Sequence, residues 1–395
     1  MPVLQTVETK AIKTRWFSPQ RPWVRLGSPS FGIDLAASLG YHLGLLRILC
    51  KMSDSFRVER GKKLPWAIYR RRQACFQILT YHRVIPEPSP FTIDAISPDV
   101  FEAQMASLGK YFTVLPIDTI VDCLYKGTPL PPNCLSITFD DGYADNYLYA
   151  YPILKKYGVP ATFFLATGYI GTGQMLWFDQ VMYVFQETTK KVFQMPYIKR
   201  PLPLGTEVER GCAALVTLYH LRTLQTDQIA NALEDIYTAL HVRPPDQDTS
   251  LMLNWDQVRE MVDNGYHFGS HTVSHPILSR LPEANAEAEI TLSKQQIEEE
   301  TGQRVSVFAY PSGRPEDYSE ETVAILKRCG YKAALANTSF AVNSLETNTY
   351  QLNRMRPWEE HVPTFLFKLC FYKGVPTDEG EMTRNNPAGQ VGLLY

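Results

Sequence analysis

Short apolar runs alternate with longer segments of helical periodicity from about residue 73 to about residue 372. Short apolar runs are typical of buried strands, and apolar positions spaced three and four residues apart are typical of helices. A strand-then-helix rhythm predicts an α/β fold with a mainly parallel sheet. The predicted strands are residues 76–81, 135–139, 161–165, 267–270, 305–309 and 333–336.

The helices predicted between these strands carry suitable start and stop residues. Pro98, Pro282 and Ser319 suit the first turn of a helix, and glycine suits the position just after its end. The glycines at predicted helix ends are Gly158, Gly265, Gly302 and Gly330. The predicted helices are residues 98–111, 117–126, 146–157, 255–264, 282–301 and 319–329.

Three regions depart from this rhythm. Residues 168–253 form a long excursion with predicted helices around 177–188 and 226–240, which we interpret as an insertion or lid on a barrel. Residues 1–72 form a basic N-terminal extension with one amphipathic helix over 31–52. The barrel is expected over 73–372, and residues 373–395 form a polar tail.

The composition is that of an ordinary folded protein, since 45% of the 395 residues are hydrophobic and 20% are charged. It excludes disordered, collagen-like and coiled-coil classes. No secretory signal opens the chain, and charged residues interrupt the helix over 31–52, which disfavours a membrane span. Seven cysteines without a Cys-x-x-Cys pair favour a reducing compartment. We therefore expect a cytoplasmic protein.

Charge is distributed unevenly behind the formal net charge of -2. The first 80 residues hold 14 Lys and Arg against four Asp and Glu, so the acidic surplus lies in the remainder. A basic extension of this kind suits contact with anionic lipid or nucleic acid, or compensation by the protein's own acidic body, and we prefer compensation because surface charge patterns are weak signals. Peripheral membrane contact through this extension stays open as the alternative.

Two adjacent carboxylates end one predicted strand, in the sequence Phe-Asp-Asp-Gly-Tyr-Ala-Asp-Asn that starts at Phe139. Like charges side by side raise each other's pKa unless a cation or proton separates them. One solution is that Asp141 binds a metal ion while Asp140 acts as a base. The alternative is an ordinary Asp-Gly turn with a helix-capping aspartate.

Two histidines follow another predicted strand, in the sequence His-Thr-Val-Ser-His-Pro that starts at His271. Residues four apart lie on one side of a helical turn, so His271 and His275 are predicted to grip one cation from such a turn. Two imidazoles and one carboxylate make a metal site that leaves positions open for water and substrate. A single histidine more often caps or packs, but this pair beside a strand-end carboxylate pair favours a metal.

Two further strand ends supply candidate groups. Tyr310, Pro311, Ser312 and Gly313 form a loop whose backbone N–H groups suit an oxyanion, although such a loop is more often a plain turn. His82 follows the first predicted strand, and strand-end residues on the carboxyl face of a barrel supply active sites.

Together these segments resemble the polysaccharide deacetylase family, the NodB-homology domain of carbohydrate esterase family four. The resemblance covers roughly residues 73–372. It implies a distorted (β/α) barrel that removes acetyl groups with a divalent metal, usually zinc. By this resemblance Asp140 is the catalytic base, Asp141, His271 and His275 are the metal ligands, and Thr272 braces the histidine loop.

The third motif departs from the common family pattern, because Ala309 stands where an arginine is often found and Ser312 where a tyrosine is. The Tyr-Pro-x-Gly form looks like the permuted poly-N-acetylglucosamine deacetylase branch. There the catalytic acid comes from an early strand, a position that His82 matches. His361 is the rival for the acid, and Arg354 resembles a late arginine that orients the base.

The expected function is therefore metal-dependent removal of an N-acetyl group from an amino-sugar glycan or glycoconjugate. One rival is a deformylase or amidase acting on a nucleotide- or lipid-linked sugar. Another is a catalytically inactive carbohydrate-binding protein, which the intact carboxylate and histidine set disfavours. Nucleic acid is not expected as a partner, because residues 168–173 lack the lysine and spacing of a phosphate loop. The oligomeric state stays open.

Overall fold

A nine-stranded sheet forms the centre of the computed structural model, which describes residues 37–38, 40–41, 75–195, 200–337, 342–357 and 359–372. Every pairing in this sheet is parallel except that of β1 with β12. The strands in spatial order are β12 (Asn343–Ser344), β1 (Cys75–Tyr81), β5 (Cys134–Phe139), β6 (Thr162–Leu165), β9 (His267–Ser270), β10 (Val307–Ala309), β11 (Ala333–Asn337) and β13 (Leu352–Arg354), with β4 (Thr113–Val114) beside β5.

The sheet curves back on itself through Met355, the residue that follows β13. The Met355 backbone N–H donates to the Ile78 carbonyl at 2.9 Å, and its carbonyl accepts from the Thr80 N–H at 3.0 Å. This parallel bridge brings the last strand against β1 and nearly closes a barrel. The carboxyl ends of the strands therefore meet at one rim, where such barrels carry their active sites.

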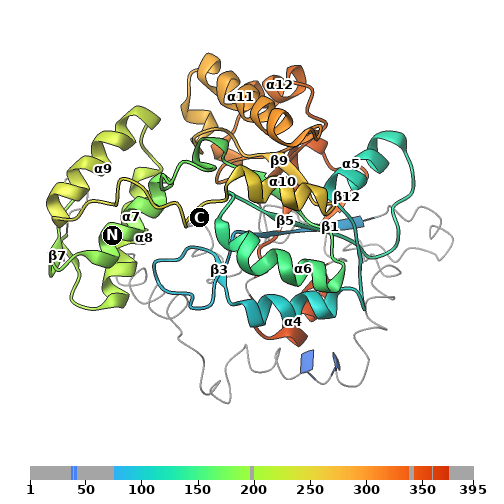
Figure 1. The fold of residues 1–395 in the computed structure, drawn as a ribbon, viewed down its shortest axis with the longest axis horizontal. Coiled ribbons are helices and arrows are strands. Elements are labelled where there is room, and N and C mark those ends of the chain that lie inside the picture. Colours follow the sequence, from blue (N-terminus) through green and yellow to red (C-terminus); the bar gives the residue numbers. More distant parts are fainter. Residues whose placement is uncertain are drawn as a thin grey trace, which may run out of the picture.

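Helices cover the outside of the barrel (Figure 1). The side chains of β1 alternate between two apolar clusters, as the pleat of a strand requires. Phe76 and Ile78 share one cluster with Ile117, whereas Leu79 and Tyr81 share the other. The helices are α4 (Pro98–Leu108), α5 (Ile117–Lys126), α6 (Tyr151–Tyr157), α10 (Trp255–Asp263), α11 (Glu283–Thr301), α12 (Glu320–Arg328) and α13 (Val362–Tyr372).

The structure confirms the predicted α/β barrel and each of its predicted strands, with ends that shift by at most two residues. The predicted barrel helices are also present, although residues 146–157 begin as the π-helix η2 (Asn146–Ala150) before α6. The sequence interpretation missed β13, which is short and ends in a buried arginine.

The excursion over 168–253 builds a helical lobe beside the barrel, drawn in yellow-green in Figure 1. It contains α7 (Trp177–Glu187), α8 (Glu207–Leu221) and α9 (Thr226–Leu240), with a small hairpin of β7 (Val192–Phe193) and β8 (Leu202–Pro203). These helices share an apolar cluster of their own that includes Phe185, Leu218 and Leu233. Two of the three helices were predicted, and α8 was missed. The division of the chain into domains stays a prediction.

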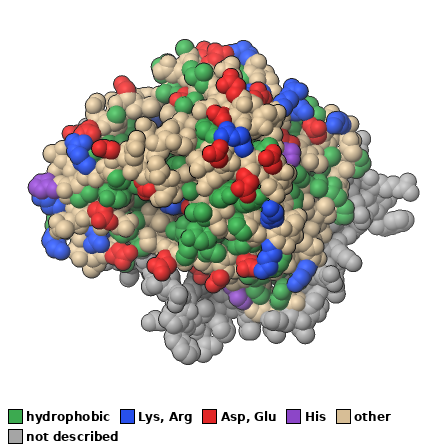
Figure 2. Space-filling model, viewed as in Figure 1, with side chains coloured by type: hydrophobic (Ala, Val, Ile, Leu, Met, Phe, Trp, Pro, Cys, Tyr) green, Lys and Arg blue, Asp and Glu red, His purple; other side chains and the backbone are tan. Residues whose placement is uncertain are grey.

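Several predictions concern residues that the structure leaves undescribed. The basic extension, most of its helix over 31–52 and the tail over 373–395 lie outside the described residues. Within the described part, no helix is long and apolar enough to cross a membrane. Cys370 is disulfide-bonded, and the expected compartment of the protein stays a prediction. On the face drawn in Figure 2, acidic and basic side chains of the described residues are interspersed rather than segregated.

Candidate active site

The adjacent carboxylates lie at the carboxyl end of β5, inside the rim. The Asp140 backbone N–H donates to the Tyr81 carbonyl at 3.0 Å, which extends the β1–β5 ladder to this residue. Asp141 then takes a φ of 74° and Gly142 a φ of 89°. A Cβ atom at Gly142 would lie 2.8 Å from the Ile170 side chain, so only glycine fits this turn. Both carboxylates are buried.

Asp141, His271 and His275 converge on one point. The Nε2 atoms of the two histidines each lie 3.4 Å from Asp141 Oδ1, and the ligand atoms of all three residues lie within 4.8 Å of one another. Asp141 Oδ1 is buried and has no hydrogen-bond partner among the described residues. An unpartnered buried oxygen between two imidazoles is the donor set that a divalent cation would complete.

Both histidines direct Nε2 toward Asp141, and His275 is neutral in the absence of a cation. His271 Nδ1 lies 2.7 Å from the Ala309 carbonyl, a contact that places the ring proton on Nδ1 and leaves Nε2 free to act as a ligand. Burial lowers the pKa of His275 to about 4, so this ring is uncharged at neutral pH. Metal ligation by the three residues remains our prediction, and their geometry fits it.

The two histidines do not lie on a helical turn, so that part of the prediction is wrong. Residues 271–277 form an irregular loop, in which Thr272 has a φ of 69° and His275 a φ of 55°. The Thr272 hydroxyl accepts from the His275 N–H at 3.0 Å, in keeping with its predicted bracing role. Strained backbone therefore gathers at this loop, as it commonly does at functional sites.

Glu289 holds the same loop from α11, and nothing in the sequence pointed to it. One carboxylate oxygen accepts from the backbone N–H groups of Val273 and Ser274 at 2.7 and 2.9 Å. The other accepts from the Ser274 hydroxyl at 2.6 Å. Glu289 thereby fixes the segment that joins the two histidines.

Arg354 pairs with Asp140 from the end of β13. Its two terminal nitrogens donate to the two oxygens of Asp140, each at 2.7 Å. Both side chains are almost completely buried. Burial by itself would raise the pKa of Asp140, but the charges of Arg354 and of the neighbouring histidines hold it well below its usual range. Asp140 is therefore a carboxylate, the form that a base requires.

His82 lies beside Asp140, whereas His361 does not. His82 Nε2 is 3.8 Å from an Asp140 oxygen, and His82 lines the same pocket as the three convergent residues. His361 is exposed, contacts Thr364 at the start of α13 and is not among the residues that line this pocket. Of the two rivals for the catalytic acid, the geometry favours His82.

An ion pair that the sequence did not reveal lies behind His82. Asp94 Oδ2 lies 3.8 Å from His82 Nδ1 and 2.8 Å from a terminal nitrogen of Arg356. Asp94 comes from the turn before β3 (Ala95–Ile96), and Arg356 follows β13. Only the folded chain brings them together.

The Tyr-Pro-Ser-Gly loop contributes one residue to the pocket. Ser312 lines it and has a φ of 61°, and its carbonyl accepts from the Asn337 amide at 3.0 Å. Tyr310 instead directs its hydroxyl to the Tyr350 carbonyl at 2.9 Å and stacks on Tyr318. Of the four predicted residues of this loop, Ser312 is the one that lines the active-site pocket, and Pro311 and Gly313 shape its turn.

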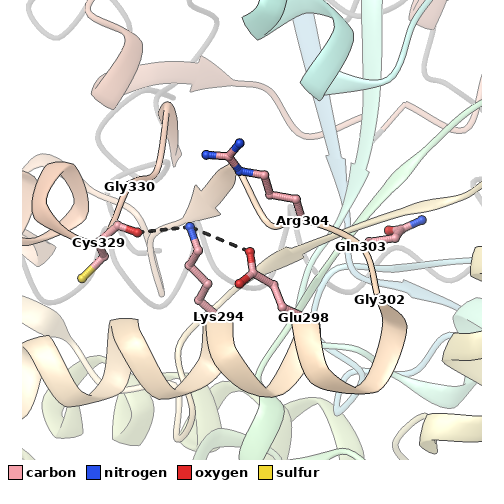
Figure 3. Close-up of a pocket in the computed structure, with 7 residues that line it drawn as sticks. All are labelled: Lys294, Glu298, Gly302, Gln303, Arg304, Cys329 and Gly330. Carbon is pink, nitrogen blue, oxygen red and sulfur yellow. Dashed lines mark hydrogen bonds and ion pairs between the residues drawn. The ribbon is translucent and has the colours of Figure 1, made fainter.

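A second hollow, shown in Figure 3, lies at the carboxyl end of α11. Lys294 Nζ donates to the Cys329 carbonyl at 3.1 Å and lies 4.0 Å from Glu298. Glu298 in turn accepts from the Val305 N–H at 2.8 Å, and Gln303 bonds the Tyr266 carbonyl. These contacts tie α11 and the turn after it to the end of α12, to the residue before β9 and to the segment before β10, so we assign the hollow a structural role.

A parallel barrel that carries two aspartates, two histidines and a third histidine at one rim defines a hydrolase-type site. The family model for polysaccharide deacetylase matches residues 127–334, which is more than half of the chain. This chain therefore belongs to the polysaccharide deacetylase family, whose members hydrolyse N-acetyl amide bonds.

Individual relatives agree with this assignment. YxkH of Bacillus subtilis (strain 168) is 25% identical over 302 residues, which cover 76% of this chain and 73% of that protein. Poly-β-1,6-N-acetyl-D-glucosamine N-deacetylase of Staphylococcus aureus (strain MSSA476) is 38% identical over 79 residues, only 20% of this chain and 27% of the relative. The structure of the Streptococcus pyogenes deacetylase PplD in complex with acetate shares the fold, with a TM-score of 0.51 and 22% identity over 75% of this chain and 99% of that one.

Proposed function

We propose that this chain is a metal-dependent deacetylase that removes the acetyl group from an N-acetylated amino sugar. The observation that carries the proposal is the grouping of Asp141, His271 and His275 beside the ionised carboxylate of Asp140. Family membership supports the reaction class, and the name of the Staphylococcus aureus relative supports an amino sugar as substrate.

Asp141, His271 and His275 would hold the cation. We propose Zn²⁺, because two imidazoles and one carboxylate with open positions suit this ion. When bound, it would polarise the acetyl carbonyl and lower the pKa of water from 15.7 to about 7.

The residues of the chain would move two protons. Asp140 takes a proton from the water whose oxygen bonds to the acetyl carbon, while Arg354 keeps this carboxylate ionised and oriented. His82 gives a proton to the sugar nitrogen as the carbon–nitrogen bond breaks, so the products are acetate and a free amine. The backbone at Ser312 borders the pocket and would stabilise the developing oxyanion.

The test is acetate release from short N-acetylglucosamine oligomers and from UDP-N-acetylglucosamine by the zinc-loaded protein. We expect the wild-type protein to release acetate and the Asp140→Asn variant to release none. Formate release from the matching N-formyl sugars, without acetate release, would favour the deformylase rival instead. Absence of any acyl release by protein with stoichiometric metal would overturn the proposal.

A further inference from the structure

Helix α8 of the insertion turns one face toward the active-site pocket. The pocket-lining residues of this helix and its end are Leu215, Leu218, Tyr219 and Arg222, which are spaced as one side of a helix. The Arg222 guanidinium donates to Asp317 at 2.9 Å, just beyond the Tyr-Pro-Ser-Gly loop. This ion pair fixes the end of α8 over the barrel rim.

The apolar surface continues from α8 to the metal-ligand group. Trp177 and Phe178 line the pocket from the first turn of α7, and Ile93 lines it from the turn before β3. The Phe178 ring centre lies 5.1 Å from that of His275, and Trp177 meets Phe178 edge-on. We call the six apolar residues the α8 roof: Ile93, Trp177, Phe178, Leu215, Leu218 and Tyr219. It faces a polar floor supplied by the barrel.

Among the described residues, each of the two arginines that line the pocket already has a carboxylate partner. Arg222 is paired with Asp317, and Arg356 is paired with Asp94 at 2.8 Å. A diphosphate, as in a nucleotide sugar, needs cationic or N–H partners when it is buried. The charges of the described pocket residues therefore favour a neutral substrate.

We propose that the α8 roof binds a neutral aliphatic group carried by the amino sugar, so that the preferred substrate is an alkyl or lipid glycoside of an N-acetylated amino sugar. This inference rests on the proposed function. Aromatic rings alone would suit the C–H faces of further sugars, but half of the roof is aliphatic, and leucine and isoleucine match an alkyl chain. Since the reaction removes an acetyl group, the aliphatic group belongs on the sugar side.

The experiment compares octyl and methyl β-glycosides of N-acetylglucosamine, with the octyl compound kept below its micelle-forming concentration. We expect kcat/KM for acetate release to be at least about tenfold higher for the octyl glycoside. In an apolar pocket, one additional buried methylene group already changes kcat/KM by this order. Equal values, or a short N-acetylglucosamine oligomer preferred over the octyl glycoside, would overturn the inference while leaving the deacetylase proposal intact.

Two variants connect the preference to the roof. Leu215→Ser, which changes a half-buried side chain on α8, is expected to bring the octyl-to-methyl ratio toward one. Leu292→Ser is the matched control, because Leu292 is 54% exposed on α11 and does not line the pocket. It is expected to keep the wild-type ratio. A ratio that Leu215→Ser leaves unchanged contradicts the assignment of the roof.

Binding to Asp140→Asn protein separates the two proposals, because calorimetry needs no turnover. The octyl glycoside is expected to bind at least about tenfold more tightly than the methyl glycoside. If the wild-type protein releases no acetate but the variant still binds the octyl glycoside more tightly, the aliphatic site is retained and the deacetylase proposal is overturned. Equal binding of both glycosides would overturn the aliphatic site.

Discussion

The two terminal guanidinium nitrogens of Arg354 each donate a 2.7 Å hydrogen bond to one oxygen of the Asp140 carboxylate. Such a bidentate pair fixes both the charge and the orientation of the carboxylate. Residues 214 positions apart in the chain thus form one unit of the site.

We expect Arg354→Gln to lower kcat by about two to three orders of magnitude, since it removes the group that orients the base. Without the Arg354 guanidinium, burial raises the pKa of Asp140. Asp140 then gains its proton at a higher pH, so kcat/KM begins to fall at a higher pH on acidification. The measurement is a pH profile with metal content checked at each end. A folded Arg354→Gln variant whose pH profile keeps the wild-type acid limb would contradict the role of the pair. The control is Arg259→Gln, which removes an exposed ion pair on α10.

His82→Ala should lower kcat for N-acetyl sugars by about 10²–10³-fold, whereas His361→Ala should leave it near wild type. The reason is that the sugar nitrogen must gain a proton before it can leave as an amine. 4-Nitrophenyl acetate has a leaving group that needs none, so His82→Ala should cleave it at close to the wild-type rate. A loss confined to His361→Ala would assign the acid to His361, and equal losses in both variants would contradict the assignment to His82.

Glu289→Gln should weaken metal binding by about 10–100-fold, because Glu289 holds the backbone between the two histidines. Glu287→Gln is a matched control on the same helix, where Glu287 pairs with Arg328 at the surface. Competition with a chromogenic chelator measures both affinities. Indistinguishable affinities would show that the loop keeps its shape without this clamp.

Asp179 should make the protein less stable as pH rises. Burial raises the pKa of Asp179 to about 7, against about 3.9 in an unfolded chain. Between these values only the folded state holds the proton, so stability is fully present below about pH 4 and declines as pH rises through 7. Asp179→Asn retains an acceptor for the Tyr143 hydroxyl. Its melting temperature relative to wild type should increase from pH 4 to pH 8, and a constant difference would refute this.

The sequence predicted the barrel well because its strands are continuous apolar runs with helix signals between them. It missed β13 because Leu-Asn-Arg reads as a polar loop, although Asn353 and Arg354 pair with β11. Helix α8 was missed since its apolar residues serve both the lobe core and the pocket roof, and Leu218 belongs to both. Tertiary burial rather than local periodicity defines both elements.

The site residues at strand ends were predictable, because each of these motifs directly follows an apolar run that predicts a strand. Glu289 and the pair of Asp94 with Arg356 were not, since each acts through contacts between segments far apart in the chain. The histidine spacing suggested a helical turn, but Thr272 and His275 adopt positive φ values instead. An i, i+4 spacing fixes which residues can meet a cation, not the backbone that presents them.

The most direct test measures bound metal and acetate release together in Asp140→Asn and Asp141→Asn. The two variants remove neighbouring carboxylates of identical chemistry, so each is the control for the other. The account predicts that Asp140→Asn keeps close to one zinc per chain and loses acetate release, whereas Asp141→Asn loses both. Full metal content with wild-type acetate release in Asp141→Asn would contradict it.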